Sequence, residues 1–280
     1  MANEISERID RIMKKRPLYK EALSLYKDLM TLLDDVETEI KYVRNDESLS
    51  EVKEKEGFPL FSAESLPLDF KAASSLFQRL LEYLTSKKRK DKEALKNTLD
   101  KVRTDSKWMN DIINAFLAGN EEILLKTSKE LGLEPAVLSF LIYMALKPSL
   151  NTFRESVKEK IKEGSWQYGY CPLCGSYPDI AYLDEQGTRF LHCQLCGHEW
   201  RYPRLKCPSC KNEKAKELGY FESDQEKGFR VDFCKKCNHY IKTLDTRITG
   251  QPAPLELESL TTLHLDMLAQ EQGFKALHSV

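Results

Sequence analysis

Residues 171–198 read CPLCGSYPDIAYLDEQGTRFLHCQLCGH, and residues 207–239 read CPSCKNEKAKELGYFESDQEKGFRVDFCKKCNH. Together they hold all eight cysteines of the chain, in four C-x-x-C pairs. The pairs are Cys171/Cys174, Cys193/Cys196, Cys207/Cys210 and Cys234/Cys237. A C-x-x-C turn lets two thiolates reach one ion, and a β-hairpin can bring a second turn opposite the first. Eighteen residues separate the first two pairs and 23 separate the last two, so the spacing predicts two tetrathiolate metal sites.

The two halves of this region repeat one another. Each reads C-P-x-C, a hairpin, G-x-R, and then C-x-x-C-x-H, with the G-x-R at Gly187 and again at Gly228. The simplest arrangement is two tandem ribbons, each closing its own site, with two ions per chain. Only ten residues link Cys196 to Cys207, so pairing of the two inner turns is the alternative.

Metal is expected to hold these ribbons folded. A ribbon this short buries too little apolar surface to be stable alone, and a structural metal contributes about 10–16 kcal/mol per site. Four protein ligands leave no open position for water or substrate, so we expect no hydrolytic catalysis at these sites. Iron and zinc both accept tetrahedral sulfur, and the ligand set does not choose between them.

The residues around the ribbons have helical periodicity. Residues 1–165 contain no cysteine or histidine, and apolar side chains recur at helical spacing over 19–43 and 70–84. Further helices are predicted around 91–103, 106–117, 120–131, 135–146 and 151–163, with a loop at 45–69 and a break at Lys147–Pro148. After Pro252 and Pro254, a last helix is predicted to continue to Gly273, with one face formed by Leu260, Leu263, His264, Met267 and Leu268.

These patterns predict an α+β multidomain chain. An N-terminal all-α helical bundle (1–165) precedes two tandem rubredoxin-like or zinc-ribbon β modules (166–204 and 205–250). A C-terminal helix (251–280) packs on the rest. Short β-rich runs at 188–191 and 229–231 lie inside the two ribbon modules.

Charge and hydropathy narrow the classes of function. The chain has 43 Lys and Arg against 44 Asp and Glu, and residues 171–247 have 13 against 11 before the thiolates add negative charge. Zinc ribbons that bind nucleic acid usually need a clear excess of positive charge, so nucleic acid is not the expected partner. The start, MANEISERIDRIMKKRP, has no apolar run typical of a signal peptide, and we expect a soluble cytoplasmic protein without membrane insertion. In that reducing compartment, paired cysteines indicate metal.

Other readings of the cysteines and histidines are weaker. Haem attachment needs C-x-x-C-H, whereas His198 and His239 come one residue too late. Thioredoxin-like chemistry uses one C-x-x-C on a βαβ unit and not four in tandem hairpins. With four thiolates per site, His192, His198 and His239 are expected beside the ligands or at the surface. The chain also lacks G-x-S-x-G, H-E-x-x-H and phosphate-loop motifs, which favours a binding or assembly role.

The chain resembles the FdhE family of formate dehydrogenase accessory proteins. The resemblance rests on W-x-x-G-Y-C-P-L-C-G-S (166–176), G-x-R-F-L-x-C-x-L-C (187–196), R-x-K-C-P-x-C (204–210), C-x-x-C-x-x-Y-I-K (234–242) and L-T-T-L-H-L-D (260–266). R-P-x-Y (16–19) and G-F-P-L-F (57–61) fit the family's N-terminal half.

The resemblance implies a cytoplasmic assembly factor, not an enzyme, for respiratory molybdenum or tungsten formate dehydrogenase. Its partner would be the catalytic subunit of that enzyme, and the resemblance is also compatible with a homodimer of this chain. The family's centres are rubredoxin-like and iron-binding, which carries over to the eight cysteines as ligands of iron or zinc. The alternatives are a rubredoxin-like electron-transfer protein and, third, a nucleic-acid-binding zinc-ribbon protein.

Overall fold

The computed structural model describes residues 2–40, 47–161, 164–224, 226–250 and 254–277, which divide between two compact units. Unit 1 comprises Met1–Leu23, Asn45–Ser62 and Val157–Val280, and unit 2 comprises Ser24–Arg44 and Ala63–Ser156. The predicted α+β class is confirmed, with helices first, then the two ribbons, then helix again. The four predicted domain ranges remain a proposal.

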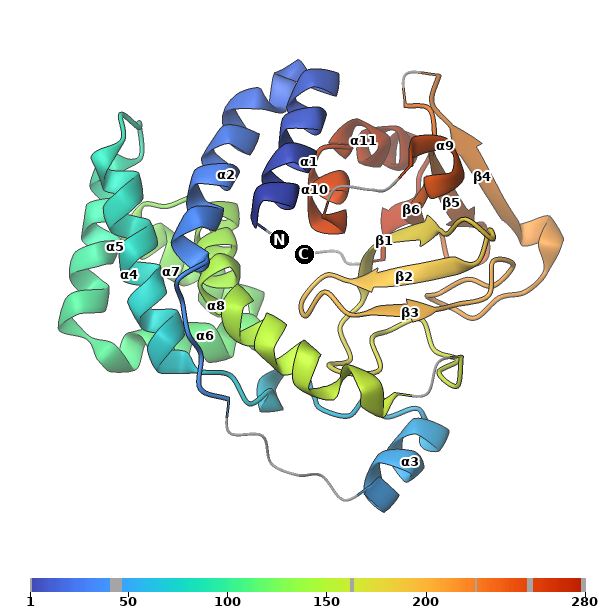
Figure 1. Ribbon diagram of the computed structural model, residues 1–280, viewed down its shortest axis with the longest axis horizontal. Coiled ribbons are helices and arrows are strands. Elements are labelled where there is room, and N and C mark those ends of the chain that lie inside the picture. The colour runs from blue at the N-terminus through green and yellow to red at the C-terminus, as the bar shows by residue number, and fades with distance from the viewer. Residues whose placement is uncertain (1, 41–46, 162–163, 225, 251–253, 278–280) are drawn as a thin grey trace. The chain divides into compact units, whose positions relative to one another are not determined.

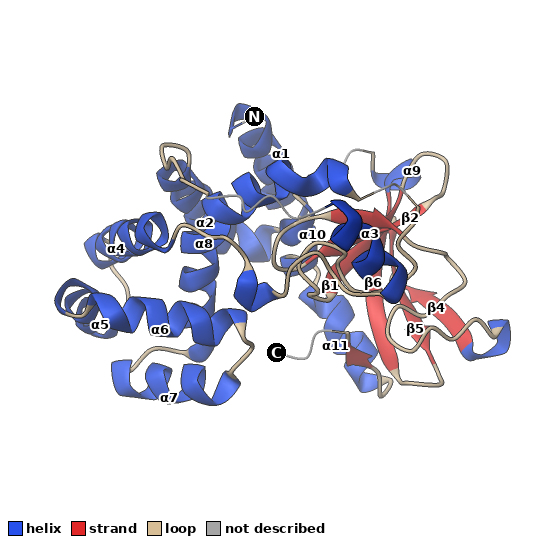
Figure 2. Ribbon diagram, turned by 90° about the horizontal axis from the view of Figure 1, so that it is seen from below, coloured by secondary structure: helices blue, strands red, loops and turns tan. Residues whose placement is uncertain are grey.

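Unit 2 is helical (Figure 2), and apolar side chains of its helices are buried. Its helices are α2 (Lys20–Leu33, which begins in unit 1), α4 (Phe70–Ser86), α5 (Lys92–Thr104), α6 (Ser106–Leu117), α7 (Glu121–Leu131) and α8 (Pro135–Val157). Leu76, Phe77, Leu80 and Leu81 of α4 are almost fully buried, as their helical spacing predicts. The helices predicted at 70–84, 91–103, 106–117 and 120–131 are therefore confirmed.

Helix α8 corrects one prediction, because the expected break at Lys147–Pro148 does not occur. Proline removes a single backbone donor from a helix, and Leu146, Leu150 and Phe153 on either side are buried. By length and composition alone, α8 could cross a membrane. However, 61% of its most apolar window is buried inside the protein, as in a core helix.

The prediction for 19–43 is wrong beyond Leu33, where α2 ends. Asp34 and Asp35 follow at the end of the helix that carries negative partial charge, which disfavours a further turn. The predicted face extends to Val43, which lies outside the described residues. The loop predicted at 45–69 contains helix α3 (Glu47–Glu56) instead.

Asp69 caps helix α4, and we expect Asp69→Ala to lower the free energy of unfolding by about 1–2 kcal/mol. Its carboxylate accepts the N–H of Ala72 (2.9 Å) and the N–H of Glu39 (3.0 Å). Burial raises the pKa of Asp69, but these N–H donors outweigh burial, so the net pKa is lowered. The cap therefore stabilises the fold above the unfolded pKa of about 3.9 and is lost as pH falls through the folded pKa.

Urea unfolding at pH 7 and at pH 3 measures the effect of this cap. Glu64→Ala is the control, because Glu64 is exposed on the turn before α4. An equal loss of stability at both pH values would contradict the capping role.

Unit 1 is built on one mixed sheet that joins the two ribbons (Figure 1). The strands are β1 (Pro178–Leu183), β2 (Arg189–Cys193), β3 (Glu199–Arg201), β4 (Leu218–Glu222), β5 (Phe229–Cys234), β6 (His239–Asp245) and β7 (Lys275–Ala276). Their order is β3-β2-β1-β6-β5-β4, with β7 also paired to β6. Strand β1 of the first ribbon runs parallel to β6 of the second, pairing Ile180 with Lys242. The ribbons therefore form one continuous sheet.

The C-terminal segment packs on this sheet as two helices, not one. Helices α10 (Leu255–Leu260) and α11 (Leu263–Glu271) are separated at Thr261 and Thr262, whose hydroxyls donate back to the carbonyls of Leu257 and Glu258 (both 2.7 Å). Unit 1 also contains α1 (Ala2–Lys15) and the short α9 (Thr246–Thr249).

The apolar face predicted for a single last helix is not the face that packs on the sheet. Leu260 and Leu263 are each 49% exposed and Met267 is 62% exposed, whereas Leu265 and Ala269 are buried against the sheet. The break at 261–262 changes the helical phase between α10 and α11. Residues that would share one face of a continuous helix therefore do not share the buried face of the two shorter helices.

Candidate metal centres

All four C-x-x-C turns adopt the same backbone shape. In each, the residue after the second cysteine donates its N–H to the carbonyl of the first cysteine over 2.8–3.0 Å, closing the turn. That residue has positive φ, between 57° and 77°, in every turn. The four residues are Gly175, Gly197, Lys211 and Asn238. The shared turn gives the two cysteines of each pair the same backbone setting.

The turns bring the sulfurs together in two groups of four. In the first, the Sγ atoms of Cys171 and Cys196 are 3.6 Å apart and those of Cys174 and Cys193 are 3.4 Å apart. Within each group all four sulfurs lie within 4.8 Å of one another. A tetrahedral ion with metal–sulfur bonds of about 2.3 Å separates its ligands by about 3.8 Å. The first group therefore has the dimensions of a tetrathiolate site.

The second group has similar dimensions. The Sγ atoms of Cys207 and Cys237 are 3.6 Å apart, and those of Cys210 and Cys234 are 3.7 Å apart. Each group joins the two turns of one ribbon, so the alternative that pairs the inner turns is not the arrangement adopted. The eight cysteines thus form two sets of four, which could hold two ions. Their role as metal ligands stays a prediction.

The electrostatics of the first group favour a bound cation. Its four cysteines are buried, and burial raises the pKa of Cys171 and of Cys193 well above the usual thiol value. Four thiolates can share such a volume only when a cation compensates their charge. When bound, iron or zinc would supply that charge and cross-link the two turns.

The second group is more accessible than the first. Cys210 and Cys237 are partly exposed, while Cys207 and Cys234 are buried. Burial raises the pKa of Cys234, but N–H donors including the amide of Asn212 (3.6 Å from Sγ) outweigh it and bring that pKa to about 7. The two centres are therefore unequal in their access to solvent.

We predict that a chelator removes metal from the protein in two phases, with the second centre emptied first. Solvent reaches two of its thiolates, whereas the first centre must open before a chelator can attack it. Release is followed by the absorbance of a metallochromic chelator at neutral pH. Cys210→Ser should abolish the fast phase, and Cys174→Ser should abolish the slow one. A single phase of two ions would contradict unequal access.

A segment far earlier in the chain contacts the first turn. The N–H groups of Leu60 and Phe61 donate to the carbonyls of Pro172 and Leu173 (2.8 and 3.0 Å). Tyr170 donates its hydroxyl to the carbonyl of Gly57 (2.5 Å). The sequence indicates only that apolar residues of 57–68 need burial. The G-F-P-L-F stretch at 57–61 is the sequence feature that corresponds to this contact. Residue spacing alone does not predict that this stretch packs against the first C-x-x-C turn.

The three histidines near the cysteines lie outside both sulfur groups. His192 shares a hydrogen bond with Asp179 (2.7 Å), and His239 Nδ1 contacts the carbonyl oxygen of Cys237 (2.9 Å). The ring of His198 is nearly parallel to that of Trp200, with centroids 6.4 Å apart. Among the described residues, each group that could hold a metal consists of four cysteines and includes none of these histidines.

The segment joining the ribbons has a packing role. Trp200 and Tyr202 are buried, and Trp200 donates its indole N–H to the carbonyl of Tyr168 (3.1 Å). Tyr202 donates its hydroxyl to the carbonyl of Cys207 (3.1 Å). Tyr202 therefore links the second centre to the segment that joins the ribbons, whereas Trp200 packs toward the residues before the first turn.

Comparison with known proteins identifies two matched regions. Residues 170–204 match the family described as "FdhE, central domain", and residues 205–279 match "FdhE, C-terminal domain". A "Protein FdhE homolog" of Aquifex aeolicus (strain VF5) is 39% identical over 155 residues, 54% of this chain and 54% of that protein. One from Stutzerimonas stutzeri (strain A1501) is 35% identical over 108 residues, 37% of this chain and 35% of that protein.

The matched stretches span about half of the first relative and about a third of the second. The crystal structure of the FdhE protein from Pseudomonas aeruginosa shares the fold over nearly the whole chain. Its TM-score is 0.68 at 23% identity, covering 97% of this chain and 91% of that one. The fold likeness thus extends well beyond the cysteine-rich region.

Proposed function

The chain belongs to the FdhE family, and from that premise we propose that it is an accessory factor in the maturation of respiratory formate dehydrogenase. In this proposal it binds the catalytic subunit of a molybdenum or tungsten enzyme in the cytoplasm and catalyses no reaction itself. The observation that carries the proposal is the pair of four-sulfur groups inside the family-matched residues 170–279.

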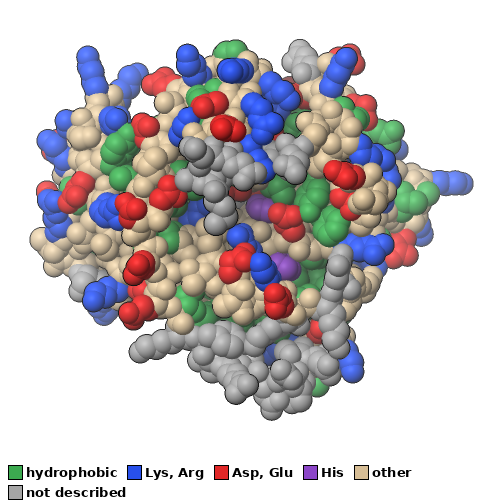
Figure 3. Space-filling view, in the orientation of Figure 1, with side chains coloured by type: hydrophobic (Ala, Val, Ile, Leu, Met, Phe, Trp, Pro, Cys, Tyr) green, Lys and Arg blue, Asp and Glu red, His purple; other side chains and the backbone are tan. Residues whose placement is uncertain are grey.

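The shape of the sites supports a scaffold role. Four protein ligands would surround each ion, which leaves no position for a substrate. Loss of metal would then act on the client indirectly, by loosening the surface that the ribbons present. The surface charge also disfavours nucleic acid, because on the face drawn in Figure 3 positive and negative side chains are interspersed. A homodimer remains part of the proposal, and light scattering tests it.

Titration calorimetry against the isolated catalytic subunit tests the client. We expect the metal-loaded protein to bind, the chelated protein to bind at least about tenfold more weakly, and Cys207→Ser to behave like the chelated form. Ser209→Ala changes the same turn without removing a thiolate and is the matched control. Absence of binding by every form, together with intact formate oxidation in a deletion strain, would overturn the proposal.

Electron transfer is the second candidate, and the partial exposure of Cys210 and Cys237 favours it. An iron tetrathiolate can cycle one electron without a change of ligands. Iron-loaded, aerobically purified protein should then be red and bleach reversibly with dithionite. A colourless, zinc-filled protein from iron-replete cells would eliminate this candidate.

A further inference from the structure

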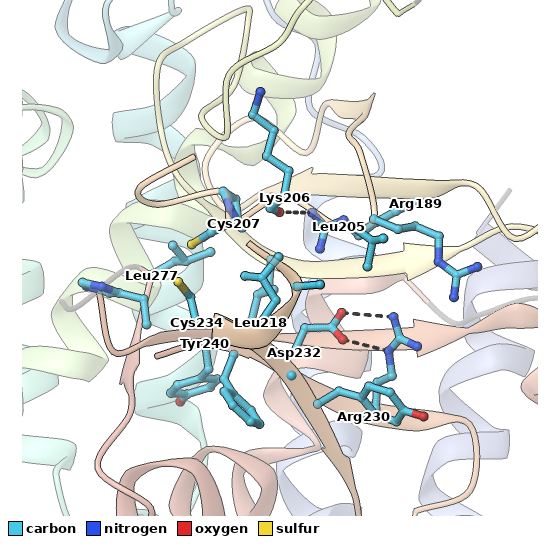
Figure 4. Close-up of a pocket in the computed structure, with 18 residues that line it drawn as sticks. Arg189, Leu205, Lys206, Cys207, Leu218, Arg230, Asp232, Cys234, Tyr240 and Leu277 are labelled. Atoms are coloured by element: carbon cyan, nitrogen blue, oxygen red, sulfur yellow. Dashed lines mark hydrogen bonds and ion pairs between the residues drawn. The ribbon is translucent and has the colours of Figure 1, made fainter. Parts of the chain in front are cut away.

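A pocket of about 170 Å³ lies beside the second cysteine group (Figure 4). Cys207 and Cys234 line one side of it, and Leu218 and Phe233 contribute apolar surface. Cationic side chains complete its lining, among them Arg189 and Arg230. Pockets that combine an apolar wall with a few polar groups are the usual form of small-ligand sites.

The two arginines occupy equivalent positions in the internal repeat. Arg189 and Arg230 are the third residues of the two G-x-R motifs, at the start of β2 and beside the start of β5. The parallel pairing of β1 with β6 joins the ribbons, and both arginines line the same pocket. Neither cysteine group includes these arginines, so metal ligation does not explain the motif.

The two guanidinium groups differ in their partners. Arg230 Nε lies 2.9 Å from Oδ1 of Asp232. Oδ2 of the same carboxylate accepts a hydrogen bond from the hydroxyl of Thr243 (2.6 Å). Arg189 is 3% exposed and donates to the carbonyls of Pro203 and of Lys206, the latter over 2.6 Å. In the described part of the chain, its Nε has no hydrogen-bond partner and no carboxylate forms an ion pair with it. A buried cation in this state favours an anion.

We propose that this pocket binds a small organic anion, with its carboxylate on Arg189 and its apolar body against Leu218 and Phe233. A cavity of about 150 Å³ accepts a benzene-sized molecule, so the pocket fits a ligand of benzoate size. Asp232 does not repel the ligand strongly, because Arg230 and Thr243 already engage its oxygens. This site lies outside the proposed assembly function and needs no client protein.

A second role for Arg189 competes with this one. Four thiolates around a divalent ion carry a net negative charge, which a nearby guanidinium would offset without any ligand. Under that role the pocket would take neutral and anionic molecules equally well. The anionic ligand and its neutral isostere therefore distinguish the two roles.

Saturation-transfer NMR and calorimetry on the metal-loaded full chain provide the test, with benzoate, benzyl alcohol and inorganic phosphate as probes. We expect benzoate to bind at least about tenfold more tightly than benzyl alcohol, because a hydrogen bond between a guanidinium and a carboxylate is stronger than one to a neutral hydroxyl. Phosphate tests whether charge alone suffices, and it should bind more weakly than benzoate because it has no apolar body.

Three variants complete the design. Arg189→Gln should weaken benzoate at least about tenfold, and Arg201→Gln, an exposed arginine on β3, should leave it unchanged. If Arg189→Gln loses its metal or its fold, Leu218→Trp tests the site instead. The larger side chain of Leu218→Trp fills the pocket and leaves the charge of Arg189 in place. No benzoate binding, equal binding of benzyl alcohol, or full binding by Leu218→Trp would overturn the proposal.

Discussion

Replacing Cys171 and Cys174 together with serine is expected to lower bound metal by one ion per chain and to unfold the first ribbon. Both residues come from the turn that closes the first group, and hydroxyls do not replace thiolates as ligands of iron or zinc. A structural site contributes about 10–16 kcal/mol, which is as large as the whole stability of a typical domain, about 5–15 kcal/mol. The loss is therefore too large for the ribbon to remain folded by apolar burial.

The structure also predicts how far this damage spreads. Leu60 and Phe61 are hydrogen-bonded to the lost turn, and β1 pairs with β6 of the second ribbon. Amide exchange should become fast at 58–61 and across 171–196. The second centre draws all its ligands from 207–237, so we expect it to keep its ion.

Metal analysis by mass spectrometry, with hydrogen exchange on the same sample, measures both effects. Gln194→Ala is the matched control, because Gln194 lies inside a C-x-x-C turn and is not among the four sulfur ligands. Loss of both ions would show that the shared sheet couples the centres. Loss of none would show that these cysteines do not bind metal.

Arg16→Ala is expected to lower the free energy of unfolding of unit 1 by about 3 kcal/mol. The guanidinium of Arg16 is 2.9 Å from Glu226 and 3.2 Å from Glu258, and it donates to the hydroxyl of Thr261 (2.6 Å). It also lies over the ring of Phe229, 5.1 Å from the centroid. Its removal leaves two largely buried carboxylates without their shared partner.

Urea denaturation of unit 1 measures this loss through the fluorescence of Trp166 and Trp200, which are both buried there. Arg16→Lys should restore part of the stability, because one ammonium cannot serve three partners in the geometry of a guanidinium. Lys15→Ala removes an exposed cation from the same turn and should change stability by less than about 0.5 kcal/mol. A stability of Arg16→Ala equal to that of Lys15→Ala would refute the role of this network.

Arg16 also shows where sequence reasoning stops. The chain offers Arg16-Pro17 as a motif, but its partners lie 210 and 242 residues away. Spacing cannot reveal such contacts, since nothing local in 226 or 258 points to residue 16. The pocket arginines illustrate the same limit, because the repeat identifies G-x-R twice but only the folded sheet places both residues around one cavity.

The sequence by itself determined the features that depend on neighbouring residues. These include the positions of the four C-x-x-C turns and helices such as α4, whose apolar spacing matches one buried face. Hairpin length limits which turns can meet, and helical period determines which side chains share a face. Both are short-range properties of the chain, so they can be read without a structure.

Tertiary structure alone decided the features that depend on burial. Helix α8 continues through Pro148 because its buried side chains outweigh one missing hydrogen bond. Helix α11 buries Leu265 and exposes Met267 because, after the helix is interrupted at 261–262, the side of α11 that carries Leu265 packs against the sheet. The two ribbons form one sheet because the edges of β1 and β6 pair in parallel, and unpaired strand edges carry no signal in the sequence.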